Sequence, residues 1–189
     1  MVTGTVNYPK SYDAIYRSGY IIGFIGICLF TVFFILNNIF SASIGVIIFD
    51  IGTLLSGLFL LVWRKEIKVF IVSCIITGLI LTLMLLFVFS TGGLLRNEIF
   101  IVATGLVLAG MGGMYGKEAH CFHFFEGWVL MWSFPVIILI NLIVYGLNLQ
   151  LVPAVHFLLS AIYIFIALLA LSFLIKKLTQ PLMQFCENA

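Results

Sequence analysis

The sequence predicts an all-α integral membrane protein built as a bundle of six transmembrane helices. The first observation is composition, since 63% of the 189 residues are hydrophobic and only 8% are charged, whereas soluble proteins carry about 25% charged residues. The second is six apolar runs of membrane-spanning length, about 17–25 residues each. The third is an uneven distribution of lysine and arginine between the loops. A chain this apolar could not hide its surface from water, so the lipid bilayer is its expected solvent.

The spans follow one another with short polar breaks between them. The first begins after 17 fairly polar residues and is too long for the apolar part of a signal peptide, so we expect a retained signal anchor. The breaks read NNIFSAS, RKEIK, TGGLLRNE, GKEAHCFHFFEG and NLQLVP. The predicted spans are 18–40, 41–63, 69–90, 99–116, 128–149 and 151–175. They form one transmembrane domain over 18–175, between an N-terminal segment, 1–17, and a C-terminal tail, 176–189.

The fourth span is rich in glycine, including a GxxxG pair at Gly112 and Gly116. Small residues allow transmembrane helices to pack closely. Two interpretations stay open: close contact with a neighbouring helix, or a central position in the bundle with an inner end that unwinds.

Basic residues predict the orientation of the spans, because cytoplasmic loops carry an excess of lysine and arginine. With six spans, both termini and the second and fourth loops share one side. Eight basic residues fall on that side: Lys10, Arg17, Arg64, Lys65, Lys68, Lys117, Lys176 and Lys177. The other side holds only Arg96. Both termini are therefore expected in the cytoplasm or its organellar equivalent.

Reactive side chains gather between the fourth and fifth spans, in the segment MYGKEAHCFHFFEGW at 114–128. On a continuous helix, at 100° per residue, one half of the surface carries Lys117, Glu118, Cys121 and Glu126. The other half carries His120 and His123. Lys117 is the closest partner for Glu118, and it also lies one turn from Cys121, where it would favour the thiolate. Charge is tolerated here because the segment is expected at the membrane surface.

The same segment resembles a family of uncharacterised integral membrane proteins, domain of unknown function 2301, that is common in cyanobacteria. In that family a helix rich in small residues runs into Lys-Glu-x-x-Cys-Phe, then a glutamate and an apolar helix with a proline. The matching positions are Lys117, Glu118, Cys121, Phe122, Glu126 and Pro135. The resemblance covers 99–145 and implies a multi-span membrane protein of oxygenic phototrophs, without an established activity. The two histidines are not part of the pattern.

Metal binding and thiol catalysis are weaker interpretations of this segment. A zinc site needs three or four converging ligands, and Cys121 points away from His120 and His123 on a helix. Cys121 as a nucleophile would need a base, and Glu118 is a weak base for a thiol. The four cysteines show no pairing motif, so we expect no disulfide. We therefore expect no metal and no cofactor.

Asp50 is the most informative single residue, because it lies near the middle of the second span. A charged carboxylate at that depth costs ~2.5–3.5 kcal/mol on insertion scales. Asn141, at a comparable depth in the fifth span, is a candidate hydrogen-bond partner. The functional interpretation is a proton or cation relay, and the structural one is a neutral interhelical hydrogen bond. Asp50 lies ~15 Å in depth from the charged segment, at 1.5 Å per residue, with no evident polar residues between them.

These observations favour a non-enzymatic accessory, assembly or scaffold protein of a membrane complex, photosynthetic or bioenergetic, with Lys117, Glu118, Cys121, Phe122 and Glu126 as its docking element. The alternative is a small proton- or cation-coupled transporter using Asp50 with Glu118 or Glu126. The third is a membrane enzyme that depends on Cys121. The expected partners are the lipid bilayer and either another membrane protein or a second copy of the chain, in a plasma or thylakoid membrane. The net charge of +2 does not suggest nucleic acid, and no Walker A, HExxH or GxSxG motif occurs.

Overall fold

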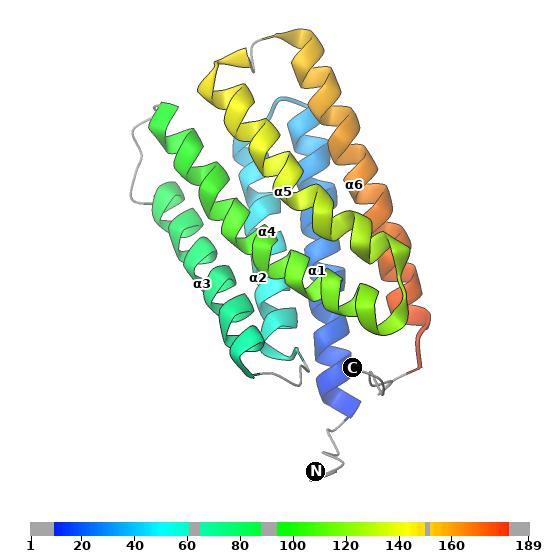
Figure 1. Ribbon diagram of the computed structural model, residues 1–189. Coiled ribbons are helices and arrows are strands. Elements are labelled where there is room, and N and C mark those ends of the chain that lie inside the picture. The colour runs from blue at the N-terminus through cyan, green and yellow to red at the C-terminus, as the bar shows by residue number, and fades with distance from the viewer. Residues whose placement is uncertain (1–9, 61–64, 88–93, 150–151, 182–189) are drawn as a thin grey trace.

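The computed structural model describes residues 10–60, 65–87, 94–149 and 152–181, which form six long helices (Figure 1). The helices are α1 (Lys10–Ile35), α2 (Ile39–Leu58), α3 (Lys65–Phe87), α4 (Leu94–Phe122), α5 (Phe125–Gly146) and α6 (Pro153–Thr179). All six are long and apolar enough to cross a membrane, and the described residues contain no strand. The predicted helical class and the six candidate spans are confirmed.

Five helices, α1 and α3 to α6, extend beyond the predicted spans at the same end of the bundle. α1 already begins at Lys10, α4 continues to Phe122, and α6 reaches Thr179. The inner end of α4 therefore does not unwind, and segment 114–128 is mostly helix. Two ion pairs join charged side chains of different helices in these extensions, Lys177 with Glu118 and Lys176 with Glu126.

Short turns join α1 to α2 and α4 to α5. Asn37 adopts the left-handed backbone conformation, with φ 56°, and Asn38 caps α2 by accepting a hydrogen bond from the Ser41 N–H at 3.1 Å. Between α4 and α5 the chain turns at His123, with φ 55°. α6 begins with Pro153. Proline is favourable at the first position of a helix, because the N–H that it lacks would make no hydrogen bond within the helix there.

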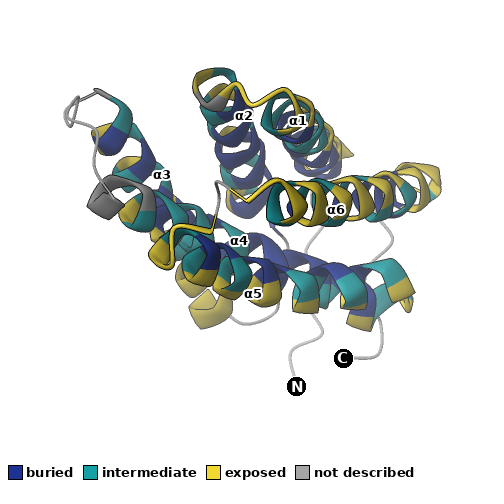
Figure 2. Ribbon diagram, turned by 90° about the horizontal axis from the view of Figure 1, so that it is seen from above, coloured by how far each residue is buried: buried dark blue, intermediate teal, exposed yellow. Residues whose placement is uncertain are grey.

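The helices form a closed ring, because each packs against the next in the chain and α6 returns to α1. α2 and α4 also contact one another, which places α4 between α2, α3 and α5. Figure 2 shows exposed positions along the outer faces of α5 and α6 and buried positions between helices. Many exposed residues are large and apolar, as expected of a surface that faces lipid.

α1 and α2 approach so closely that their contact requires glycine. A Cβ atom at Gly19, Gly26, Gly45 or Gly52 would lie within 3.0 Å of the backbone of the other helix. This small-residue contact is typical of tightly packed transmembrane helices. α1 and α2 therefore pack backbone to backbone, and a side chain larger than hydrogen at these four positions would separate them.

Candidate functional site

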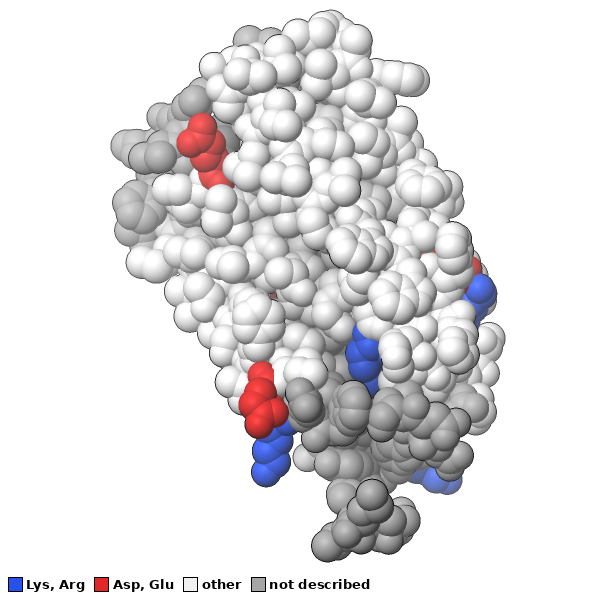
Figure 3. All heavy atoms as spheres, viewed as in Figure 1, with Lys and Arg blue, Asp and Glu red and all other residues white. Residues whose placement is uncertain are grey.

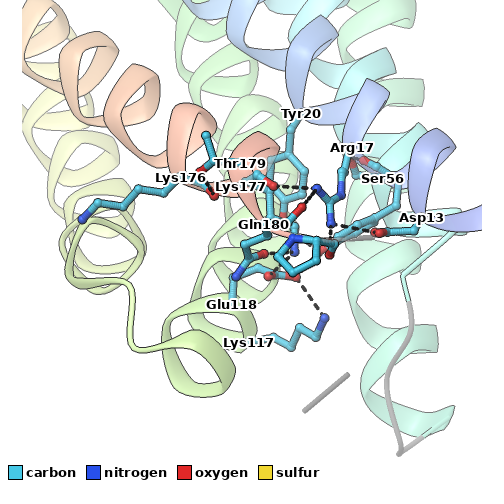
Figure 4. A network of polar contacts seen from close by, with 12 residues as sticks. Asp13, Arg17, Tyr20, Ser56, Lys117, Glu118, Lys176, Lys177, Thr179 and Gln180 are labelled. Atoms are coloured by element: carbon cyan, nitrogen blue, oxygen red, sulfur yellow. Dashed lines mark hydrogen bonds and ion pairs between the residues drawn. The ribbon is translucent and has the colours of Figure 1, made fainter. Parts of the chain in front are cut away.

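The carboxylate of Glu118 in α4 is fully enclosed, with 0% of the residue exposed, beside the start of α1 and the end of α6 (Figure 4). Its Oε1 accepts hydrogen bonds from Lys117 Nζ at 2.9 Å and from the Tyr16 hydroxyl at 2.8 Å. Its Oε2 accepts one from Lys177 Nζ at 2.6 Å. We call Tyr16, Lys117, Glu118 and Lys177 the Glu118 cluster. Its donors come from α1, α4 and α6, so the buried charge joins these three helices.

Lys177 is almost as enclosed as its partner, with 3% exposed. Its ammonium group also donates to the side-chain oxygen of Gln180 at 3.1 Å. It lies 4.8 Å from the ring centroid of Phe122 and 5.4 Å from that of Tyr16, within the range of cation–π attraction. From the sequence, Lys177 was expected only to contribute to orientation, because its partner Glu118 lies 59 residues away.

Arg17 holds the C-terminal end of α6 against α1. The last carbonyl groups of a helix have no partner within the helix, and the Arg17 guanidinium donates to three carbonyl oxygens at this end. These belong to Lys177 at 2.9 Å, Gln180 at 2.7 Å and Pro181 at 2.9 Å. Asp13, one turn earlier on α1, pairs with Arg17 at 3.0 Å and balances its charge. Arg17, which was predicted to lie in the N-terminal segment 1–17, is thus buried and holds α6 against α1.

Glu126 does not belong to the Glu118 cluster. The chain turns at His123, so Glu126 lies in the first turn of α5 rather than on the helix that carries Glu118. It pairs with Lys176 at 2.6 Å and accepts a hydrogen bond from Ser172 at 3.0 Å. The predicted placement of Glu126 on one helix with the earlier motif residues is wrong. What Glu126 provides is a second, more exposed link, between α5 and α6.

Cys121 is disulfide-bonded, which corrects the expectation that the chain has no disulfide. Disulfide pairing depends on proximity in the fold, which the cysteine spacing did not reveal. A bonded sulfur offers no thiolate, so the predicted effect of Lys117 on Cys121 does not arise here. His120 and His123 are both exposed. Among the described residues, no group of three or more His, Cys, Asp or Glu could hold a metal ion.

Asp50 lies near the middle of α2 with 0% exposed. Neither carboxylate oxygen has a hydrogen-bond partner among the described residues. The hydroxyl of Thr82 in α3 is close enough to act on the carboxyl group, but it does not meet hydrogen-bond geometry. A buried polar group without a partner is rare in native proteins, so this carboxyl group calls for a functional explanation.

Asn141 does not contact Asp50, contrary to the predicted hydrogen bond. Its side-chain nitrogen donates to the carbonyl of Ile137 at 2.8 Å, and its oxygen accepts from the Tyr163 hydroxyl at 2.9 Å. α5 packs against α4 and α6 and makes no contact with α2 in the described residues. Comparable depth in the membrane therefore did not imply proximity around the ring.

Buried polar side chains lie along α2 between Asp50 and the level of Tyr16. Asp50, Thr53 and Ser56 recur every three residues along α2, and all three have 0% exposed. The Ser56 hydroxyl donates to the backbone carbonyl of Tyr16 at 2.8 Å, and the Tyr16 hydroxyl donates to Glu118. Thr53 and Ser56 were not predicted from the sequence, although their regular spacing on one side of α2 is visible there.

A groove of about 610 Å³ lies between α5 and α6. Its lining includes Trp128, Trp132 and Phe165, with aliphatic side chains and Ser133. The Ser133 hydroxyl donates to the carbonyl of Leu130 at 2.9 Å, which leaves the groove apolar. Figure 3 shows a largely uncharged face, on which the visible basic side chains lie in the half nearer the chain ends.

No model of a known protein family matches the chain, and searches of curated proteins and of solved structures found no match either. The resemblance to the domain of unknown function 2301 family therefore stays a prediction that rests on its motif residues.

Proposed function

We propose that this chain carries a small cation across its membrane, with Asp50 as the group that binds the ion. The observation that carries the proposal is a fully enclosed carboxyl group whose two oxygens have no partner in the described residues. Placing such a group in a membrane is costly, and intramembrane carboxylates that face a bundle interior are functional candidates for that reason. A purely structural aspartate would be expected to bond to a neighbouring helix.

The Glu118 cluster supplies the second element of the proposed pathway. Thr53, Ser56 and Tyr16 are buried and lead from Asp50 toward Glu118. Glu118 is held closed by Lys117 and Lys177, so an ion can reach it only when these contacts rearrange. We propose that Glu118 exchanges ions at this end of the bundle, while Glu126 remains a link between α5 and α6.

Ion flux into liposomes that contain the purified protein tests this proposal. The intact protein should support flux down an imposed proton or sodium gradient, and Asp50→Asn should abolish it. Glu66→Gln is the matched control, because Glu66 is an exposed carboxylate in the first turn of α3. Flux that survives Asp50→Asn, or an intact protein without flux, would overturn the proposal.

The second candidate is the accessory, assembly or scaffold function in a photosynthetic or bioenergetic membrane complex. The groove between α5 and α6 favours it, and its occupant would be an apolar transmembrane helix of a partner protein. The motif side chains are less suited to docking, since Glu118 is enclosed and Lys117, Phe122 and Glu126 contact residues of the same chain.

A pull-down in mild detergent, resolved on a native gel, tests this second candidate. Trp132, 66% exposed, lines the groove, whereas Phe157, 79% exposed, lies on α6 outside its lining. Migration with a large complex that is lost on Trp132→Ala but kept on Phe157→Ala would support docking. A small homogeneous particle from native membranes would exclude it.

For the side of the membrane, we propose that both termini face the cytoplasm or stroma of a plasma or thylakoid membrane. The eight-to-one distribution of basic residues supports this orientation. The disulfide at Cys121 favours the opposite side, because disulfides persist mainly in oxidising compartments. A direct measurement of sidedness, described below, decides between these two expectations.

A further inference from the structure

Unpaired buried oxygen atoms concentrate on three residues of neighbouring helices. Six buried side-chain nitrogen or oxygen atoms in the described residues have no hydrogen-bond partner. Four of them are the two carboxylate oxygens of Asp50 and the hydroxyl oxygens of Thr82 and Thr104. Because native proteins pair nearly all buried polar atoms, three such residues need a common explanation if they lie together.

Contacts between the helices place these residues at one depth. Gly57 of α2 and Gly110 of α4 both approach Ile75 of α3. Asp50 lies seven residues before Gly57, and Thr82 lies seven residues after Ile75 in the antiparallel helix. Asp50 and Thr82 are therefore both ~10 Å from the level of Ile75, in the same direction along the bundle, at 1.5 Å per residue. Because seven residues make nearly two helical turns, Asp50 shares a helix face with Gly57, and Thr82 shares one with Ile75.

Thr104 reaches the same level from α4. It lies six residues before Gly110, or ~9 Å at 1.5 Å per residue. It also precedes Met111 by seven residues and Glu118 by fourteen, two residues that are 1% and 0% exposed. Seven residues make nearly two turns, so Thr104 shares the interior face of α4. The unpaired oxygens of α2, α3 and α4 thus lie at a similar depth, on faces that turn toward the bundle interior.

We propose that Asp50, Thr82 and Thr104 form a binding site for a sodium-sized monovalent metal cation. Carboxylate and hydroxyl oxygens are hard ligands that suit cations of this kind. The three side chains carry one negative charge in total, which one monovalent cation neutralises, whereas a divalent ion would leave an uncompensated charge inside the membrane. A proton would neutralise Asp50 and allow a hydrogen bond with the nearby Thr82 hydroxyl, but it would leave the Thr104 hydroxyl unpaired. The inference rests on the proposed transport function, for which it names the ion.

Sodium-dependent stability of the full chain in mild detergent tests the site. The midpoint of thermal unfolding is measured over a series of NaCl concentrations, with choline chloride keeping the ionic strength constant. A ligand that binds the folded state raises this midpoint progressively. Equilibrium binding of radioactive sodium to the same preparations provides a second measurement that does not depend on unfolding.

The intact protein should be stabilised by sodium and not by choline. Asp50→Asn, which keeps the side-chain shape, should remove both sodium binding and the stabilisation. Thr82→Val and Thr104→Val should each weaken sodium binding at least ~10-fold, the factor that corresponds to 1.4 kcal/mol. Thr31→Val is the matched control, since Thr31 is buried but its hydroxyl donates to the carbonyl of Ile27 at 2.8 Å.

Failure of the site and failure of transport give different results. No sodium binding to the intact protein, or binding that survives Asp50→Asn, overturns the cation site. Proton flux that depends on Asp50 without any sodium binding also overturns the site, yet it retains the proposed transport. Sodium binding that depends on all three residues without any flux supports the site and overturns transport.

Discussion

Replacing Lys177 with methionine should destabilise the protein far more than the same replacement of the adjacent Lys176. Both ammonium groups lie 2.6 Å from a glutamate, but the side chain of Lys177 is 4% exposed and that of Lys176 is 48% exposed. Removing one partner of a buried ion pair costs ~3–5 kcal/mol, whereas an exposed pair contributes ~0–1 kcal/mol. Because Glu118 keeps Lys117 and Tyr16, we expect the lower value, about 3 kcal/mol, for Lys177→Met.

Unfolding titrations with a denaturing detergent, starting from mild-detergent micelles, measure both losses. About 3 kcal/mol corresponds to a roughly 100-fold shift in the folding equilibrium, since 1.4 kcal/mol is tenfold. Adding Glu118→Gln to Lys177→Met should recover part of the loss, because the buried charge that lacks its partner is then gone. Equal losses for Lys177→Met and Lys176→Met, or no recovery in the double variant, would refute the assignment of Glu118 as a buried charge held by Lys177.

Four further predictions concern packing, a hydrogen bond, sidedness and the disulfide. Gly52→Ala would place a Cβ within 3.0 Å of the α1 backbone and should cost ~1–3 kcal/mol of stability in the same titration. Gly146→Ala is the control and should change stability little, because no heavy atom lies within 4 Å of a Cβ at Gly146. Tyr163→Phe removes the 2.9 Å hydrogen bond to Asn141 and should cost ~0.6 kcal/mol, and less than ~1.7, so a much larger loss would point to further contacts of this hydroxyl. A C-terminal reporter that works only in the cytoplasm should be active, and an inactive reporter would reverse the proposed orientation. In the denatured protein, Cys121 should resist alkylation until a reductant is added. Alkylation before reduction would exclude the disulfide.

The structure changes the interpretation of the charged segment between the fourth and fifth spans. Its charges were expected at a membrane surface, but Glu118 is enclosed and joins α1, α4 and α6. The predicted pairing of Glu118 with Lys117 is confirmed at 2.9 Å. The segment therefore joins three helices at this end of the bundle, and any rearrangement that separates them must break the contacts of Glu118.

The sequence by itself determined the helical class, the six apolar helices and the place of Asp50 inside the second of them, because hydropathy and residue position are local properties. Only the tertiary structure decided what these residues meet. Tyr16 and Glu118 are 102 residues apart, and Asn141, the expected partner of Asp50, bonds to Ile137 and Tyr163 instead. Sequence periodicity specifies which face of a helix a residue occupies and how deep it lies. It does not specify which helix lies opposite that face, because that depends on the order of helices around the ring and on how closely small residues allow them to pack.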